Sequence, residues 1–446
     1  MNLQGVRVKQ GRYDAAIIGS GMGGLCAAAL LTHQGYKVLV VEKLPQLGGR
    51  CFTIEYKGFK IPHGAWEQPT QGMTAALFKE VGAEFNIRPH PPVVYRIRGK
   101  DYELPQKGQF AAALSVCCKD EAEFNRIRTA IHRAVTWAEP SSSISLRDWL
   151  LQYTDNETVM DFFQAPCVAL FTSTIHELPA QAYIVCNKAI MREWSQAGTP
   201  PRGNIALMES LAKVVRQRGG EIWTHSPAKR ILTTDGVVKG IVVERDGAEV
   251  EITAKAVISN AGPKETVRLV GEDNLDKGYV REIEQNVHPS CLIATTIISD
   301  RPLHRYPGGL NIVGARRVAS ISCVTLTCPE LAPPGKHLHL ATAGPERQLA
   351  PLNLEKEIRL IIEDLREHLP GLDRHGEILN ISCHQGDWPA YRILPHYWLT
   401  QKTPVENLYN VGDGVAPVGW AASTGAALSA RIVVEDLTKR FKPGEA

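Results

Sequence analysis

The chain has 446 residues, which is more than one hydrophobic core usually organises, so two domains or one large composite fold are expected. Hydrophobic residues make up 44% and charged residues 22%, and these values exclude an intrinsically disordered protein. The formal net charge is +3, from 50 basic and 47 acidic residues, a balance that indicates no nucleic-acid partner.

The sequence gives no sign of a targeting or membrane-spanning segment. Residues 1–14 contain no apolar core of signal-peptide length. No run approaches the roughly 18 to 20 apolar residues that cross a bilayer. The ten cysteines include no CxxC pair, which favours reduced thiols. We therefore expect a cytoplasmic protein, and a peripheral contact with a membrane stays open.

The first elements form a predicted βαβ unit. Residues 13–18 predict a buried parallel strand, 22–34 a helix and 37–41 a second strand. The turn after the first strand, Gly19-Ser-Gly-Met-Gly-Gly24, matches G-x-G-x-x-G. Gly19 permits a tight turn, Gly21 lets the backbone approach a diphosphate, and Gly24 lets the helix pack close to the strand. The motif predicts a dinucleotide whose diphosphate rests on the helix N-terminus.

Two features after the second strand extend this prediction. Glu42 follows Gly24 by 18 residues, where a carboxylate accepts hydrogen bonds from ribose hydroxyls and repels the 2′-phosphate of NADP. Gly48-Gly49-Arg50 comes next. The glycines let the backbone turn against a cofactor, and the guanidinium of Arg50 adds a positive charge with hydrogen-bond donors beside it. The alternative is a solvated strand end followed by a surface turn.

Further along the chain, 204–218 predicts a helix, 221–224 a strand, 230–244 a hairpin and 256–259 another strand. A strand at 407–411 and a helix from about 420 to 439 follow near the C-terminus. If the dinucleotide carries a flavin, Asp413, just after that last strand, would accept hydrogen bonds from its ribityl chain. The N-terminus of the last helix would then face the edge of the flavin where negative charge collects. An Asx turn capping a buried strand is the alternative.

These blocks predict an α/β fold with a discontinuous Rossmann-type nucleotide-binding domain and an inserted α+β substrate domain. The first takes residues 1–75, 204–270 and 385–446, and the second takes 76–203 and 271–384. A second G-x-G-x-x-G after a central strand is absent from the sequence, so a separate NAD(P)H domain is not expected. No cluster of His, Cys and Asp has zinc-like spacing, and we expect no metal.

The three blocks together resemble the phytoene desaturase-like and amine oxidase-like superfamily of FAD-dependent oxidoreductases. The resemblance rests on the N-terminal unit with Gly48-Gly49-Arg50, the central stretch 229–263 and the terminal stretch 409–420. It implies FAD as the cofactor, and it places residues 61–66 near the isoalloxazine. It also implies FAD contacts at Gly19, Ser20, Gly21, Gly24, Glu42, Lys43, Gly49, Arg50, Ala228, Gly412, Asp413, Trp420 and Ala421.

Four polar residues that flank these motifs are the candidate catalytic groups: His63, Tyr391, Arg392 and His396. His63 departs from the family pattern, which often has an acid or a small residue there. Each of the four also fits a packing or ion-pair role. Two apolar stretches, 110–117 and 162–171, predict either a lining for a lipid-like substrate, a contact with a membrane, or core helices.

We therefore expect an FAD-dependent oxidoreductase that dehydrogenates or saturates a hydrophobic, isoprenoid- or carotenoid-like substrate. A flavin amine oxidase is the alternative enzyme, and the electron acceptor stays open among oxygen, a quinone and a second protein. The non-enzymatic alternative resembles Rab escort and GDP-dissociation-inhibitor proteins, which bind prenylated partners. Glu42, Arg50 and Asp413 favour the enzyme, because those binding proteins depart from the superfamily at the FAD-contacting positions.

Overall fold

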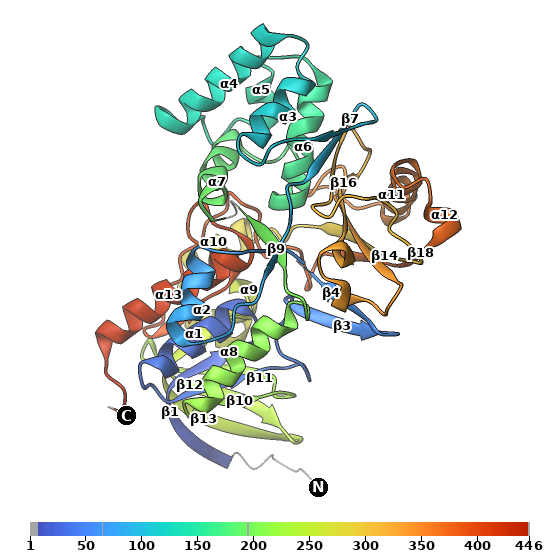
Figure 1. The fold of residues 1–446 in the computed structure, drawn as a ribbon. Helices are drawn as coiled ribbons and strands as arrows, with labels where there is room; N and C mark the ends of the chain where they lie inside the picture. Colours follow the sequence, from blue (N-terminus) through green and yellow to red (C-terminus); the bar gives the residue numbers. More distant parts are fainter. Residues whose placement is uncertain (1–7, 65, 194–195, 445–446) are drawn as a thin grey trace.

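Two seven-stranded sheets organise the molecule (Figure 1). The computed structural model describes residues 8–64, 66–193 and 196–444. The strand order of the first sheet is β10-β2-β1-β13-β12-β11, and β19 pairs with the end of β13. Its strands are β1 (Val8–Ile18), β2 (Val38–Val41), β10 (Glu221–Trp223), β11 (Ala228–Thr234), β12 (Val237–Arg245), β13 (Ala248–Ser259) and β19 (Leu408–Asn410).

The parallel strands of the first sheet end together at one edge. Ile18 of β1 pairs with Val41 of β2 and with Ser259 of β13, and Ser259 pairs with Asn410 of β19. The segments that follow these strands therefore begin side by side, although they lie far apart in the sequence. Ligands bind at this edge in open α/β sheets.

Helices cover both faces of this sheet because its central strands are apolar on both sides. Alternate residues of β1 and β2 enter two separate cores, with Ile17 and Val40 in one and Ile18 and Val41 in the other. The first core holds α1 (Met22–His33), α2 (Met73–Val81), α8 (Ile205–Gln217) and α13 (Ala422–Arg440). The second holds α9 (Pro263–Val270) and α10 (Lys277–Asn286).

The second sheet has the order β18-β14-β17-β16-β15-β7-β8. Its pairs are antiparallel except that β15 runs parallel to β7. On one face, α11 (Leu354–His368) and α12 (Leu372–His375) share a core with the sheet. The strands are β7 (Val94–Ile97), β8 (Lys100–Glu103), β14 (Leu292–Ser299), β15 (Leu310–Val313), β16 (Val318–Cys323), β17 (His337–Ala343) and β18 (Gly376–His384).

A group of helices lies at the end of the molecule away from the first sheet, at the top of Figure 1. It contains α3 (Gln109–Cys117), α4 (Glu121–Thr136), α5 (Leu146–Leu150), α6 (Glu157–Phe171) and α7 (Ala180–Glu193). Helix α6 crosses β15, β16 and β17. Two small sheets, β3 (Phe52–Tyr56) with β4 (Phe59–His63), and β5 (Gln68–Pro69) and β6 (Arg88–Pro89) with β9 (Ala197–Thr199), complete the fold.

The predicted α/β fold class is confirmed. The predicted domain boundaries stay a prediction. Two helices that they assign to the substrate domain, α2 and α10, pack against the first sheet. Leu77 and Phe78 of α2, and Tyr279 and Ile283 of α10, pack in the cores of the first sheet although their positions were assigned to the substrate domain. The sequence periodicity of such a helix gives the apolar face but not the sheet that covers it.

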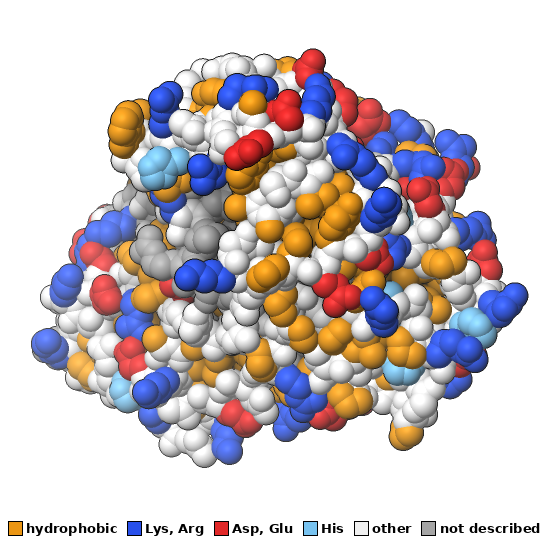
Figure 2. Space-filling model, turned by 45° about the horizontal axis from the view of Figure 1, so that its top comes forward, with side chains coloured by type: hydrophobic (Ala, Val, Ile, Leu, Met, Phe, Trp, Pro, Cys, Tyr) orange, Lys and Arg blue, Asp and Glu red, His pale blue; other side chains and the backbone are white. Residues whose placement is uncertain are grey.

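The surface shows no block of one charge on the face in Figure 2, where basic and acidic side chains alternate with apolar ones. Within the described residues, no helix combines the length and the apolar character that crossing a bilayer requires.

Candidate active site

One cavity of about 820 Å³ begins at the carboxyl edge of the first sheet and extends to the space between α6 and the second sheet. Its first part is lined by the loops after β1, β2, β13 and β19 and by the first turn of α13. Its second part is lined by α3, α6, α7 and the second sheet. The cavity therefore joins the predicted nucleotide site to the predicted substrate segments.

The glycine motif forms a close cradle at the start of this cavity. Gly19 has a φ of 93°, which favours glycine. A Cβ on Gly21 would lie 2.6 Å from Nδ2 of Asn260, and one on Gly24 would lie 2.1 Å from the carbonyl oxygen of Gly19. No side chain caps the N-terminus of α1, and its first turn has no acidic residue. Its free amides thus suit an anion such as a diphosphate.

Glu42 lies on the cavity wall, where two neighbouring residues orient its carboxylate. Ser20 donates from its backbone N–H at 2.8 Å and from Oγ at 2.7 Å to Oε2, and the Leu44 N–H donates to Oε1 at 2.9 Å. A carboxylate has about four lone-pair sites, so acceptor capacity remains for a ribose hydroxyl. Ser20 is buried behind the wall and supports Glu42.

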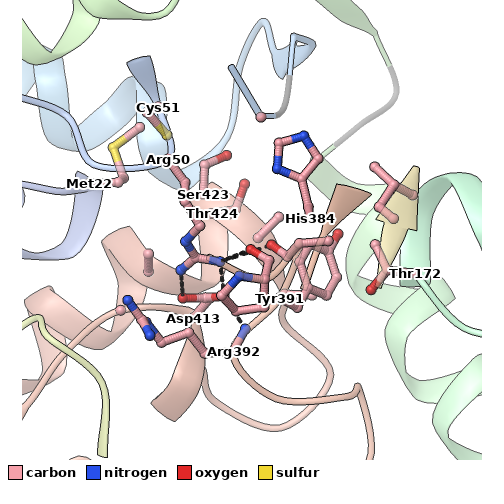
Figure 3. Close-up of a pocket in the computed structure, with 18 of the residues that line it drawn as sticks. Met22, Arg50, Cys51, Thr172, His384, Tyr391, Arg392, Asp413, Ser423 and Thr424 are labelled. Carbon is pink, nitrogen blue, oxygen red and sulfur yellow. Dashed lines mark hydrogen bonds and ion pairs between the residues drawn. The ribbon is translucent and has the colours of Figure 1, made fainter. Parts of the chain in front are cut away.

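Arg50 and Asp413 meet further along the wall (Figure 3). Nη1 of Arg50 donates to Oδ2 of Asp413 at 2.9 Å and to the carbonyl oxygen of Ala390 at 2.8 Å, and Nη2 donates to Oδ1 of Asp413. The backbone N–H of Arg392 also donates to Oδ2, at 2.9 Å. Burial works to raise the pKa of Asp413, but the Arg50 charge and these hydrogen bonds bring it below its usual value.

The N-terminus of α13 faces the same part of the cavity. Ala421, Ala422, Ser423 and Thr424 line it, and no side chain caps the helix. The hydroxyl of Thr424 and the indole N–H of Trp66 and of Trp388 are buried with no hydrogen-bond partner among the described residues. Such orphaned groups suit a polar ligand. The glycine cradle, two uncapped helix N-termini and these unpaired groups together fit FAD.

The second part of the cavity has one apolar wall. Helix α6 contributes Phe162, Ala165, Pro166, Ala169 and Leu170 to it. Phe110 of α3 also lines it and is 37% exposed, so it lies where the wall reaches the surface. Of the alternatives for the two stretches, 162–171 both lines the cavity and packs in a core, whereas 110–117 packs mainly in that core and reaches the cavity through Phe110 alone.

The histidines are arranged differently from the prediction. His384, at the end of β18, lines the cavity, is 5% exposed and makes no hydrogen bond through its ring among the described residues. His63 packs edge to face against it, with 5.4 Å between ring centroids, and does not line the cavity. Burial, followed by the charges of His63 and Arg50, lowers the pKa of His384 to about 4. The ring is therefore neutral at ordinary pH.

His396 lies away from the described cavity wall, and its Nδ1 is buried without a partner in the described part of the chain. Burial lowers its pKa to about 4. Tyr391 lines the cavity, and its hydroxyl donates to the carbonyl oxygen of Leu170 at 2.7 Å. Arg392 also lines the cavity, and burial and the nearby Arg50 lower its pKa.

The structure brings most of the predicted site residues to one cavity: Gly19, Gly21, Glu42, Lys43, Gly49, Arg50, Ala228, Tyr391, Arg392, Gly412, Asp413, Trp420 and Ala421 line it. Ser20, Gly24, His63 and His396 lie behind or away from its wall. Sequence reasoning missed His384 and Thr424, which carry no motif of their own, and it did not name Asn260 as a site residue although Asn260 lies in the central stretch 229–263. The assigned roles stay predictions.

Comparisons with known proteins agree with this geometry. A family model described as flavin containing amine oxidoreductase matches residues 22–438. An uncharacterized protein of Methanocaldococcus jannaschii is 26% identical over 427 residues, with 94% of this chain and 98% of that protein covered. A zeta-carotene-forming phytoene desaturase of Myxococcus xanthus is 25% identical over 510 residues, with 96% and 94% covered. The crystal structure of an oxidoreductase from Methanosarcina mazei has a TM-score of 0.85 at 29% identity and covers 95% of this chain and 100% of its own.

Proposed function

The chain belongs to the family of flavin-containing amine oxidoreductases and is an FAD-dependent oxidoreductase, and on this premise we propose that it adds or removes hydrogen at a carbon–carbon bond of a neutral, largely apolar, isoprenoid-like substrate. The similarity to a phytoene desaturase over almost the whole chain supports this substrate class. The same family membership favours the enzyme over the non-enzymatic binding module.

The observation that carries the proposal is the continuity of the cavity. It runs without interruption from the glycine cradle to the apolar face of α6, so a molecule lying against Phe162 and Leu170 shares one continuous space with the cofactor site. Apolar walls with a few placed polar groups are typical of sites for small hydrophobic ligands. Such walls orient the substrate and exclude water from the reaction.

The carboxylates of the wall give little support to the alternative of an amine substrate. A cationic amine would need an unpaired carboxylate to balance its charge. Two of the five carboxylates on the described cavity wall are balanced by arginines, Glu265 by Arg268 and Asp413 by Arg50. The other three have neutral donors or a histidine as partners, but none of them belongs to α6 or to a strand of the second sheet, where the substrate would lie: Glu42 with Ser20, Glu67 with His90 and Glu193 with the Met73 N–H.

FAD, when bound, supplies the two-electron redox chemistry. The N-terminus of α13 would stabilise negative charge that the bound cofactor gains, and the guanidinium of Arg50, whose charge Asp413 balances, would help to hold the cofactor there. The ion pair with Asp413 holds that guanidinium in place, and the carbonyl oxygen of Ala390 adds a further contact.

Dehydrogenation also needs a group that takes a proton from the carbon next to the one that loses hydride, and we assign this role to His384. Its ring faces the cavity without a hydrogen-bond partner among the described residues, and it is neutral above a pH of about 4. A free ring nitrogen can therefore accept the proton in the oxidative direction and return it in the reductive direction.

The experiment is anaerobic mixing of the FAD-loaded protein with a panel of isoprenoid hydrocarbons, isoprenoid alcohols and primary amines. Flavin absorbance is followed, starting from oxidised flavin and, separately, from dithionite-reduced flavin. The proposal predicts a change of flavin redox state with isoprenoids in at least one direction. A response to amines alone would overturn it, and so would fully loaded protein that responds to nothing in the panel.

A further inference from the structure

Four polar side chains form a row across four neighbouring strands of the second sheet. Tyr95 of β7 pairs with Asn311 of β15, Asn311 pairs with Ser320 of β16, and Ser320 pairs with Thr342 of β17. All four residues line the cavity. Because directly paired residues lie about 5 Å apart, the row extends for roughly 15 Å across the sheet.

The row faces the cavity because the pleat of the strands sends its neighbours to the other side. Ile312, Ile321 and Ala341 are adjacent in sequence to members of the row, and they lie in the core shared with α11. The register shift between Val318 and Ser320 keeps Ser320 in line with Asn311 and Thr342.

Within the described part of the chain, only two of the four side chains in the row have a hydrogen-bond partner. Tyr95 and Asn311 bond to each other through their side chains. The hydroxyls of Ser320 and Thr342 have no hydrogen-bond partner among the described residues. An apolar ligand that displaced water from these hydroxyls would leave them unpaired, which costs free energy.

The opposite wall is apolar, because Phe162, Ala165 and Leu170 of α6 face this part of the cavity. None of the charged residues on the described wall belongs to α6 or to a strand of the second sheet. The second part of the cavity thus has one apolar side and one hydrogen-bonding side, and neither carries a charged side chain; Glu193, at the end of α7, accepts a hydrogen bond from the Met73 N–H. A pure hydrocarbon matches only the first side, and an ion matches neither.

We propose that the substrate is a neutral amphiphile, an apolar body that packs on α6 with a hydroxyl or carbonyl oxygen that hydrogen-bonds to Ser320 and Thr342. This inference rests on the proposed function and narrows its substrate class from isoprenoid-like molecules in general to oxygenated ones. Tyr95 and Asn311, already bonded to each other, limit where along the row that oxygen binds.

The test compares geranylgeraniol with the hydrocarbon that lacks its hydroxyl group, on the FAD-loaded protein. The dissociation constant of each is measured from the change in the flavin spectrum under anaerobic conditions, and the rate of any change in flavin redox state is recorded. We expect the alcohol to bind about tenfold more tightly or better, the effect of one or two hydrogen bonds.

The variants Ser320→Ala and Thr342→Val remove one hydroxyl each with little change of volume. Each should weaken binding of the alcohol by about 5- to 30-fold and leave the hydrocarbon unchanged or bound more tightly. Thr295→Val is the matched control, because Thr295 lies in the same sheet, is buried, has an unpaired hydroxyl and does not line the cavity. It should change neither ligand.

Equal binding of the two ligands, or variants that affect both alike, would overturn the oxygenated substrate while flavin chemistry with isoprenoids continued to support the proposed function. Absence of binding and of flavin response with both ligands would overturn the two proposals together. The two failures are therefore distinguishable.

Discussion

The guanidinium of Arg50 and the carboxylate of Asp413, 363 residues apart in sequence, form a two-pronged ion pair on the cavity wall. Arg50 follows the glycine turn of the N-terminal block, and Asp413 follows the last strand of the first sheet. One contact therefore ties together two separated parts of the FAD site.

Removing the charge of Arg50 should be strongly destabilising, because it leaves a buried carboxylate without its partner. We expect Arg50→Met to lower the free energy of unfolding by about 3–5 kcal/mol and to reduce the FAD bound per chain. Denaturant unfolding and flavin absorbance measure the two effects. The double variant Arg50→Met, Asp413→Leu should lose less stability than the sum of the single variants. An additive result would show that the pair is not coupled.

Gly24 should not tolerate a side chain. In Gly24→Ala the new Cβ would lie 2.1 Å from the carbonyl oxygen of Gly19, so the cradle must shift and FAD binding should weaken by tenfold or more. Gly371→Ala is the control, because its Cβ would meet its nearest atom at 3.6 Å and its φ is −90°. FAD titration of the two variants checks this, and equal affinity would show that Gly24 is not part of a close cradle.

Replacing His384 should slow the reaction and leave the cofactor in place. We expect His384→Gln to lower turnover by about 10²- to 10⁴-fold, the range of general acid–base catalysis, with unchanged FAD content. His396→Gln, away from the described cavity wall, serves as control.

The pH dependence gives a second readout of the His384 role. Because the pKa of His384 is about 4 in the folded protein, its ring stays neutral from pH 8 to 5, and protonation of His384 should remove no activity over that range. Turnover that persists in the glutamine variant, or a loss of activity near pH 6.5 that the variant abolishes, would contradict the assignment.

Two buried histidines, His339 in β17 and His304 in the segment between β14 and β15, should make the protein sensitive to acid. Burial lowers the pKa of His304 to about 4 and that of His339 to about 3, against the ordinary value of 6.5. The unfolded chain therefore binds protons that the folded chain excludes between pH 6.5 and 4, and stability falls as the pH drops through this window. Each ring contributes up to about 1.4 kcal/mol per pH unit.

Unfolding in denaturant at pH 7, 6, 5 and 4.5 measures this slope. In His304→Phe the slope of unfolding free energy against pH should decrease by the contribution of one proton. An unchanged slope would mean that His304 is protonated in the folded protein or is accessible to water.

Local motifs account for the part of this structure that the sequence could predict. Gly19, Gly21 and Gly24 have fixed roles in one short turn, and Glu42 and Asp413 each follow an apolar strand, so parallel pairing alone brings them to one sheet edge. The predicted packing role of Gly24 agrees with the close approach of α1 to the carbonyl oxygen of Gly19, and the FAD contacts that the resemblance implies for Ser20 and Gly24 stay predictions.

The substrate side of the cavity depends on contacts between distant segments and could not be predicted in the same way. His384 is a single histidine with no motif around it, and only the pairing of β18 with β14 brings it to the wall. The row from Tyr95 to Thr342 comes from four strands, and the register between strands is not visible in any one of them. The resemblance implies that residues 61–66 run near the isoalloxazine, which stays a prediction; the ring of His63 packs against that of His384.

The central claim is that one cavity holds FAD and an apolar substrate end to end. A crystal structure of the FAD-loaded protein soaked with geranylgeraniol tests this most directly. The account predicts the diphosphate on the amides after Gly19, the flavin ring near the N-terminus of α13, and the isoprenoid chain between α6 and the second sheet. A flavin bound away from Asp413, or an isoprenoid chain bound outside this cavity, would contradict it.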